Sequence, residues 1–456
     1  MGWLSFFLSL TLLLLSIFLP KKIKSFQNIN LFINPAIFFN ILWTFILFLS
    51  ALNLYNIDKP SDSAYWLLLL MQTCFTIGHF SILFIENRTS KQQNPEIKTK
   101  KASKEPIFCG WRLKLFYAIC ILTLLLNIID IILVIYYLSE GIPAWQVHNW
   151  TLEPYGSSNP ILDRRSFVET IVRNIILASF NLLIAPTSLY LLIKTKHKHR
   201  IPLFILSLII LITSSVAGGG GRLGFITYLG CAAIIFYINR KETFIQKIIK
   251  KYKKIFLAAI ACSILALIVI TIIRTGFGNS FKQLYTYFAL PPTLLSKWLT
   301  TISSTPHTYG MLTFYGIIGY PLRALGMLGL PLPNIFTQAT TSMLNAEKFL
   351  NVGYGVANAF VSPVYYFMID GGIIFTIIAS LFFGAITTLG IIRINKENNL
   401  KNTVLLSLII YGLFISFVRV QTVIPTYIIA FIIAESPLYS QFKPIMHKSR
   451  SIHAHK

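Results

Sequence analysis

Charged residues are scarce in this chain of 456 residues, and acidic residues are the scarcest. Only 12% of the residues are charged, with 15 Asp and Glu against 40 Lys and Arg. A soluble domain usually carries about 25% charged residues. Hydrophobic residues reach 55%, which is too apolar for a disordered chain. The composition therefore excludes a soluble globular enzyme and predicts an all-α polytopic membrane protein.

Cysteine and metal-binding patterns are also sparse. The chain has five Cys, and the sequence contains no CxxC pair and no His/Cys cluster with zinc spacing. Cys74, Cys120, Cys231 and Cys262 fall within apolar runs and Cys109 in a basic connection, so no disulfide framework is expected. A nucleotide-binding glycine motif is absent as well. We therefore expect no metal site and no cofactor.

Long apolar runs are abundant, and a run of about 17–25 residues is long enough to cross a bilayer. We predict eleven transmembrane helices within a single integral membrane domain, 1–456, at 3–19, 33–54, 64–85, 115–138, 174–193, 201–217, 223–239, 255–273, 371–392, 403–418 and 422–435. The first run has no basic residue before it and no small-residue cleavage site after it. It is therefore interpreted as a retained helix and not as a cleaved signal peptide.

The basic residues give the chain an orientation. Alternate connections and the C-terminal tail hold 29 of the 40 Lys and Arg, and the other connections hold the remaining 11. Under the positive-inside rule, this predicts an outside N-terminus and a cytoplasmic C-terminus. The net charge of +25 is then mainly a topology signal, and the predicted partner is the lipid bilayer and not nucleic acid.

Two outer connections, 139–173 and 274–370, are long enough to fold over a membrane cavity. Segment 309–330 within the second is apolar, but counting it as a span would put the basic residues of 393–402 outside. Its glycines, Pro321 and Arg323 also make a poor lipid-facing helix. We therefore predict re-entrant or interfacial helices there.

The outer basic residues are mostly arginine, although lysine dominates inside. Arginine suits phosphate because its planar fork donates two parallel hydrogen bonds. Snorkelling to lipid phosphates is the alternative. Arg222 follows Gly218 to Gly221, where successive NH groups can bind an anion or simply form a tight hairpin. Arg165, Glu169 and Arg173 share one helix face, which favours an ion-pair ladder but leaves either arginine free to face the cavity.

Two acids stand out. Asp370 is predicted at the entrance of the ninth span, where it could act as a general base, pair with an arginine or cap the helix. Asp130 lies inside the fourth span. An intramembrane acid indicates function by default, and a buried arginine partner is the competing interpretation.

Three stretches carry a resemblance to a known family. They are SerSerValAlaGlyGlyGlyGlyArgLeuGly at 214–224, ProHisThrTyrGlyMetLeuThrPhe at 306–314, and the stretch 351–372, in which Asn358 precedes aromatics and an AspGlyGly. With the topology, they resemble the Wzy-type oligosaccharide repeat-unit polymerases of bacterial O-antigen and capsule assembly. The hairpin reads GlyGlyArg here where the family usually has a GlySerArg-like sequence.

The resemblance implies a metal-independent C-type glycosyltransferase (GT-C architecture) in the bacterial inner membrane. Its substrates would be glycans on undecaprenyl diphosphate, joined at the periplasmic face, with a polysaccharide chain-length regulator as a possible partner. It assigns the leaving diphosphate to Arg222 and Arg274, with Arg323, Arg419, Arg165 and Arg173 as further candidates. It assigns the base to Asp370 or His307, and sugar contacts to Tyr309, Tyr354 and Asn358. For His307, a polar loop residue is the alternative.

Two other functions fit parts of the same pattern. An O-antigen ligase would share the fold and chemistry but use a lipid A core acceptor. A lipid-linked-oligosaccharide flippase would be a transporter, which often shows internal repeats and midplane charges. This sequence shows no repeat, and its polar features gather on one face.

Overall fold

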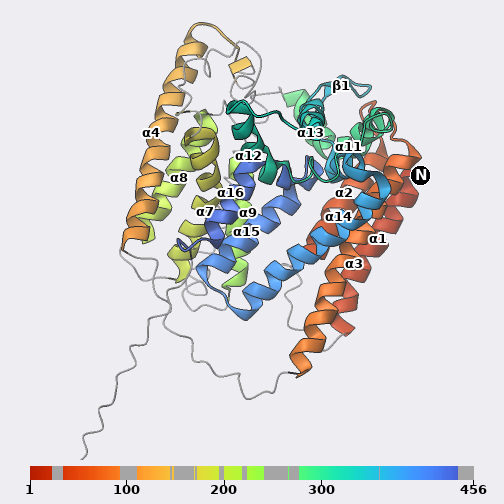
Figure 1. Cartoon of the computed structure of the whole chain (residues 1–456), viewed down its shortest axis with the longest axis horizontal. Helices are drawn as coiled ribbons and strands as arrows, with labels where there is room; N and C mark the ends of the chain where they lie inside the picture. The colour runs from red at the N-terminus through yellow and green to blue at the C-terminus, as the bar shows by residue number, and fades with distance from the viewer. Residues whose placement is uncertain are drawn as a thin grey trace, which may run out of the picture.

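The computed structural model describes residues 1–22, 34–92, 110–143, 146–147, 169, 172–194, 200–217, 223–240, 265, 277–358 and 360–439. These residues are almost entirely helical (Figure 1). Eight helices are long and apolar enough to cross a membrane: α1 (Gly2–Lys22), α2 (Pro35–Leu52), α3 (Asp62–Gln92), α4 (Trp111–Ser139), η4 with α7 (Val172–Leu177 and Ala178–Lys194), α8 (Arg200–Ala217), α14 (Ser362–Lys396) and α15 with η5 (Leu400–Phe414 and Ile415–Phe417). The chain is thus an all-α polytopic membrane protein.

Two shorter apolar helices, α9 (Leu223–Ile238) and α16 (Pro425–Glu435), coincide with two more of the predicted spans. The predicted span 255–273 lies outside the described residues, apart from Leu265. The total of eleven spans therefore stays a prediction.

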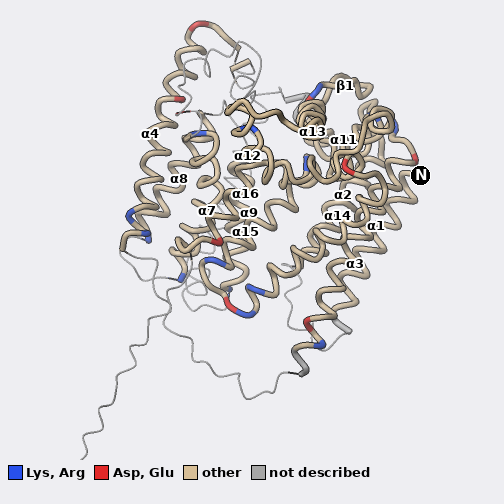
Figure 2. The backbone as a smooth tube through the Cα atoms, in the orientation of Figure 1, with Lys and Arg blue, Asp and Glu red and all other residues tan. Residues whose placement is uncertain are grey.

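Ion pairs define two ends of the helix bundle. At one end, Lys396 Nζ lies 2.9 Å from Glu86 Oε1, and Glu435 pairs with both Arg393 and Lys401. Figure 2 shows these charges near the lower ends of the helices. At the other end, the N-terminal amine lies 4.0 Å from Asp62 Oδ1. The predicted alternation is therefore consistent with the structure for these connections, while the compartment at each end stays a prediction.

A layer of three helices and a β pair covers the end that holds the N-terminus (Figure 1). It consists of α11 (Phe277–Ile302), α12 (Tyr315–Met327), α13 (Asn334–Asn345) and a small antiparallel pair of β1 (Leu350–Asn351) and β2 (Val356–Ala357). We call these elements the cap. Its 13-residue helix α12 rises about 20 Å, which is too short for a hydrocarbon core of about 30 Å. This agrees with the prediction that 309–330 does not form a twelfth span.

The most extensive helix contact joins α3 and α14, and it depends on two glycines. A Cβ added at Gly78 would lie 2.1 Å from the carbonyl oxygen of Leu381, and one added at Gly384 would lie 2.1 Å from that of Phe75. Small residues let membrane helices approach closely enough for backbone packing. Beside the crossing, His79 Nδ1 lies 2.7 Å from Thr388 Oγ1.

The crossing predicts a stability difference between two glycines of membrane helices. Gly384→Ala should destabilise the protein by about 1–3 kcal/mol, because the methyl group meets backbone that cannot rotate away. Gly230→Ala in α9 is the matched control, since a Cβ there meets no atom within 4 Å. Thermal unfolding in detergent should show a lower midpoint for the first variant only, and equal midpoints would contradict the tight crossing.

Candidate functional site

Helix α14 breaks just inside the cap. Gly371 is extended and Gly372 has a φ of 65°, so neither residue continues the helix. The break divides α14 into two helices, and Asp370 is the last residue before it, next to the predicted entrance of the ninth span. The helix that begins at Ser362 precedes that entrance. Glycine is suited to Gly372 because a positive φ strains other residues.

Asp370 is fully buried and its carboxylate is saturated with donors. Oδ1 accepts from Thr308 Oγ1 at 2.5 Å and from the Leu312 amide at 3.1 Å, and Oδ2 accepts from the Thr313 amide at 2.7 Å. Hydrogen bonds to a carboxylate stabilise its charged form and fix it in place. These contacts favour a structural role for Asp370 over base catalysis. The carboxylate caps the amides of the loop 308–313 and not those at the start of α14.

That loop in turn positions the connection between α15 and α16. Thr422 in η6 (Gln421–Val423) donates its hydroxyl to the carbonyl of Thr313 at 2.6 Å. A Cβ at Gly316 would lie 2.5 Å from the Thr422 carbonyl oxygen, so α12 and η6 are in close backbone contact. Asp370 therefore helps to hold the segment that carries Arg419.

Arg419 is the candidate phosphate ligand that the structure places best. Its Nη1 lies 2.6 Å from Glu347 Oε1, and its side chain is 26% exposed. Asn358, predicted to contact sugar, donates instead to the main-chain carbonyl of Glu347 at 2.9 Å. The cap thus supplies an acid that orients Arg419 while leaving part of the guanidinium accessible.

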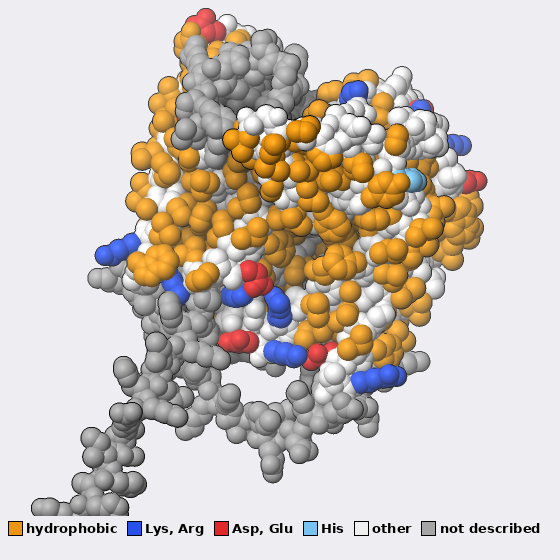
Figure 3. Space-filling model, viewed as in Figure 1, with side chains coloured by type: hydrophobic (Ala, Val, Ile, Leu, Met, Phe, Trp, Pro, Cys, Tyr) orange, Lys and Arg blue, Asp and Glu red, His pale blue; other side chains and the backbone are white. Residues whose placement is uncertain are grey.

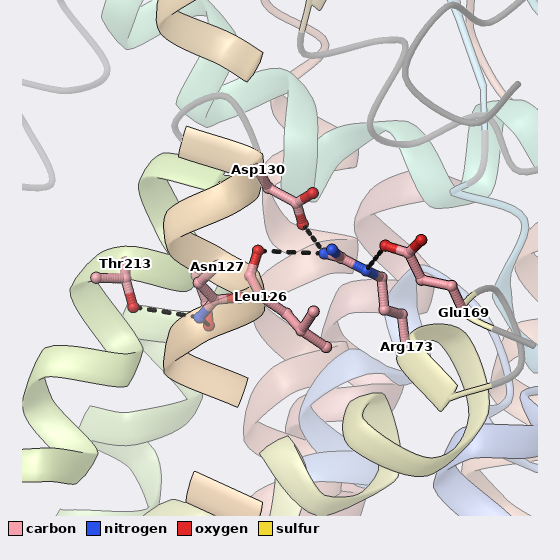
Figure 4. Close-up of polar contacts among 7 residues, drawn as sticks. Leu126, Asn127, Asp130, Glu169, Arg173 and Thr213 are labelled. Carbon is pink, nitrogen blue, oxygen red and sulfur yellow. Dashed lines mark hydrogen bonds and ion pairs between the residues drawn. The ribbon is translucent and has the colours of Figure 1, made fainter. Parts of the chain in front are cut away.

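Arg173 has a different environment, shown in Figure 4. Its Nη1 donates to Asp130 Oδ2 at 2.7 Å and to the carbonyl of Leu126 at 3.2 Å, and its Nε donates to Glu169 Oε1 at 2.7 Å. Asp130 therefore has the buried arginine partner of the competing interpretation, and the ladder from Glu169 to Arg173 is formed. With two carboxylates on one guanidinium, we assign Arg173 to holding η4 against α4 and not to phosphate.

One turn away, Asn127 anchors another helix end. Its Nδ2 donates to Ser214 Oγ at 2.8 Å and to Thr213 Oγ1 at 3.2 Å (Figure 4 labels Asn127 and Thr213). Both hydroxyls lie in the last turn of α8, just before the glycine run. Helix α4 therefore ties down the chain that leads to Arg222.

Two other predicted residues lie beside Asp370 at the break in α14. His307 Nδ1 lies 3.2 Å from the Ile369 carbonyl oxygen, and the Tyr309 amide donates to the Asp370 carbonyl at 2.9 Å. Both side chains are exposed, with ring centroids 6.4 Å apart, and Tyr309 is 76% exposed. Lys282 Nζ lies 4.7 Å from the centroid of the Tyr354 ring, and Arg323 Cζ lies 5.6 Å from that of Tyr315. The remaining candidates, Arg165, Arg222 and Arg274, lie outside the described residues.

A cavity of about 290 Å³ lies between α7, α8, α9 and α15, and we call it the chamber. Apolar side chains make up much of its lining, and the polar ones include Asn181, Ser207, Thr227, Tyr228 and Tyr411. The Ser207 hydroxyl lies 3.1 Å from that of Tyr228, which fixes the latter. Ser214 and Ser215 near the end of α8 and Gly224 at the start of α9 also line the chamber.

An apolar groove of about 540 Å³ adjoins the chamber between α2, α9 and α15, and we call it groove 1. The chamber and groove 1 share Thr227 and Tyr411. Tyr411 lies near the end of α15, and Arg419 lies in the connection that follows this helix. The chamber and groove 1 therefore meet at a tyrosine at the end of α15 that leads to Arg419.

The chamber and groove 1 were not predicted from the sequence. The signal that could have indicated them is the presence of Asn181, Thr227 and Tyr411 within otherwise apolar spans, because polar groups in a bilayer core are costly. Among the residues that the structure describes, no group of three or more His, Cys, Asp or Glu lies close enough to hold a metal ion.

Comparisons of the chain with protein-family models, with curated proteins and with solved structures found no match. The class that the fold defines is therefore an all-α multi-pass membrane protein with a helical cap at one end.

The Asp370 contacts predict that Asp370→Asn loosens the loop 308–313. An amide can accept one hydrogen bond fewer and repels an NH donor, so the loss should be about 1–3 kcal/mol. Hydrogen exchange of the Leu312 and Thr313 amides should rise. The control is Tyr309→Phe in the same loop, because that side chain is 76% exposed and the change keeps every backbone donor. If Asp370 were instead a base, the Asn variant would lose activity with unchanged exchange.

Proposed function

We propose that this protein polymerises undecaprenyl-diphosphate-linked oligosaccharide repeat units at the periplasmic face of the bacterial inner membrane. The observation that carries the proposal is the junction of the chamber and groove 1 at Thr227 and Tyr411, at the end of α15 that leads to Arg419. A lipid-linked glycan has three parts: a hydrocarbon chain, a diphosphate and sugars. The apolar groove suits the hydrocarbon chain, a guanidinium suits the diphosphate, and the hydroxyl and amide groups of the chamber suit the sugars.

The chemistry requires charge stabilisation more than it requires a metal. The bond from the sugar anomeric carbon to the diphosphate oxygen breaks, and a bond from that carbon to the acceptor hydroxyl oxygen forms. The acceptor hydroxyl loses its proton, and the diphosphate departs with the negative charge. A fixed guanidinium in a water-poor site stabilises such charge as it develops. We assign this role to Arg419, with Arg222 and Arg274 as partners.

The proton has no assigned acceptor on the enzyme. Asp370 is buried with three donors, and His307 is exposed away from any described cavity. The departing diphosphate is itself a base for the acceptor proton. Tyr309 and Tyr354 stay candidates for stacking on sugars at the cap surface, since aromatic rings offer apolar faces to sugar rings.

Arg222→Ala is the first test. The variant should insert and fold normally yet produce no polymer, because the leaving diphosphate loses a charge partner. Polymer ladders on gels from a complemented deletion strain measure the outcome. Arg393→Ala, which breaks an exposed ion pair at the opposite end of the bundle, should leave the ladder unchanged. A normal ladder from Arg222→Ala would contradict the assignment.

Arg419 allows a graded test. Arg419→Lys keeps the charge but loses the planar fork, and Arg419→Ala loses both, so lengthening should fall in the order wild type, Lys, Ala. Loss of one charge-assisted contact of about 2–3 kcal/mol corresponds to a rate loss of roughly 30- to 150-fold for the Ala variant. Purified protein and lipid-linked repeat units provide the assay. Undiminished lengthening by Arg419→Ala would remove Arg419 from the site.

The same assay separates the competing functions. A polymerase lengthens lipid-linked glycans, whereas a flippase only moves them across the membrane. In cells, loss of a polymerase leaves one repeat unit on the lipid core, and loss of a ligase leaves none.

A further inference from the structure

A second apolar groove, of about 310 Å³, lies between α14, α15 and α16, and we call it groove 2. Phe314 and Ile317 cover its outer end, and Phe367, Phe383 and Phe431 line its walls. Its rim opens sideways to the surroundings of the bundle, since Ile317 is 51% exposed, Phe382 48% and Ile386 42%. Hydrophobic side chains spread over much of the face seen in Figure 3.

Helix α15 separates the two grooves. Ser407, Ile410, Tyr411 and Phe414 face groove 1. Ile409, Gly412, Leu413 and Ser416 face groove 2. Each set repeats with the spacing i, i+3, i+4, i+7, which is one face of a helix, and the sets are offset by two residues. An offset of two residues turns about 200° around the axis, so the grooves lie on opposite faces of one helix.

The lining and position of groove 2 indicate its occupant. Its walls are hydrocarbon within membrane helices, so a hydrocarbon chain fits and a sugar does not. Gln421 and Thr422 also line its outer end, beside Phe314 and Ile317. The Ser416 hydroxyl there is buried and has no hydrogen-bond partner among the described residues. Arg419 lies in the same connection, so an anionic head is matched at the outer end by a cation.

Both grooves extend toward the connection that holds Arg419. Groove 1 reaches Phe414, the last residue of α15, and groove 2 reaches Val420, the residue after Arg419. Two anionic lipids bound in the two grooves would therefore present their heads on either side of one guanidinium.

We propose that groove 2 binds the polyprenyl chain of a second lipid-linked substrate, so that donor and acceptor lie on opposite faces of α15. The inference rests on the proposed function, in which a glycan passes between two lipid diphosphates. Two substrates held in this way have already lost the translational and rotational freedom that a reaction between separate molecules must lose. That loss is a large part of the barrier to such a reaction.

Binding of a sugar-free, photoactivatable polyprenyl diphosphate to the purified full chain tests the proposal without polymer synthesis. Native mass spectrometry should count two probes per chain, and cross-linked peptides should map to α9 and to α14. Ile409→Trp should reduce the count from two to one and remove the α14 cross-link. Ile410→Trp should also reduce the number of bound probes to one, but it should remove the α9 cross-link instead. The two variants are matched because Ile409 and Ile410 are adjacent isoleucines.

Three results would overturn the proposal. They are one probe per chain in the unmodified protein, no α14 cross-link, or an α14 cross-link that excess phosphatidylglycerol removes and excess unlabelled polyprenyl diphosphate does not. The last result would identify groove 2 as a site for ordinary acyl chains. Cross-linking of the unmodified protein decides the question if either Trp variant fails to fold. If the arginine variants make no polymer but the unmodified protein binds only one probe, the proposed function holds and the assignment of groove 2 fails.

Discussion

The buried carboxylate of Asp370 is the interaction on which the outer end of the protein depends. A buried charge is costly unless it is hydrogen-bonded, and here three donors from one loop satisfy it. The loop then holds η6 through Thr313 and Thr422. The connection that carries Arg419 is thus fixed from the break in α14, and Glu347 fixes the side chain from the cap.

The bundle below supports this arrangement by backbone packing and not by charge. The glycine crossing of α3 and α14 needs no polar group, whereas the described ion pairs of the helix ends gather at the two ends of the bundle. Asp130 and Arg173 are the exception, and they satisfy each other where water is scarce. Helix α15 can therefore present hydrocarbon on both faces and still end beside a cation.

Much of the fold could be predicted because hydrophobic length and basic residues are one-dimensional signals. Eight of the eleven predicted spans coincide with helices long and apolar enough to cross a membrane, and two more coincide with shorter apolar helices. The candidate site was less predictable, because hydrogen-bond partners depend on three-dimensional contacts. The sequence places Asp370 at the entrance of a span, but it does not reveal the helix that begins at Ser362 or the distant loop that the carboxylate binds. It also leaves the partner of Asp130 open, since spacing does not reveal which helices touch.

The break in α14 also restricts how the length of the chain can change in evolution. The carbonyls of Ile369 and Asp370 accept from the amides of Thr308 and Tyr309. These two amides supply the donors that a continuous helix would otherwise supply. An inserted or deleted residue within 308–313 would move the Leu312 and Thr313 amides out of register with the Asp370 carboxylate, while Thr308 and Tyr309 stay bonded to the break. Homologous chains should therefore keep the spacing from Thr308 to Thr313 constant.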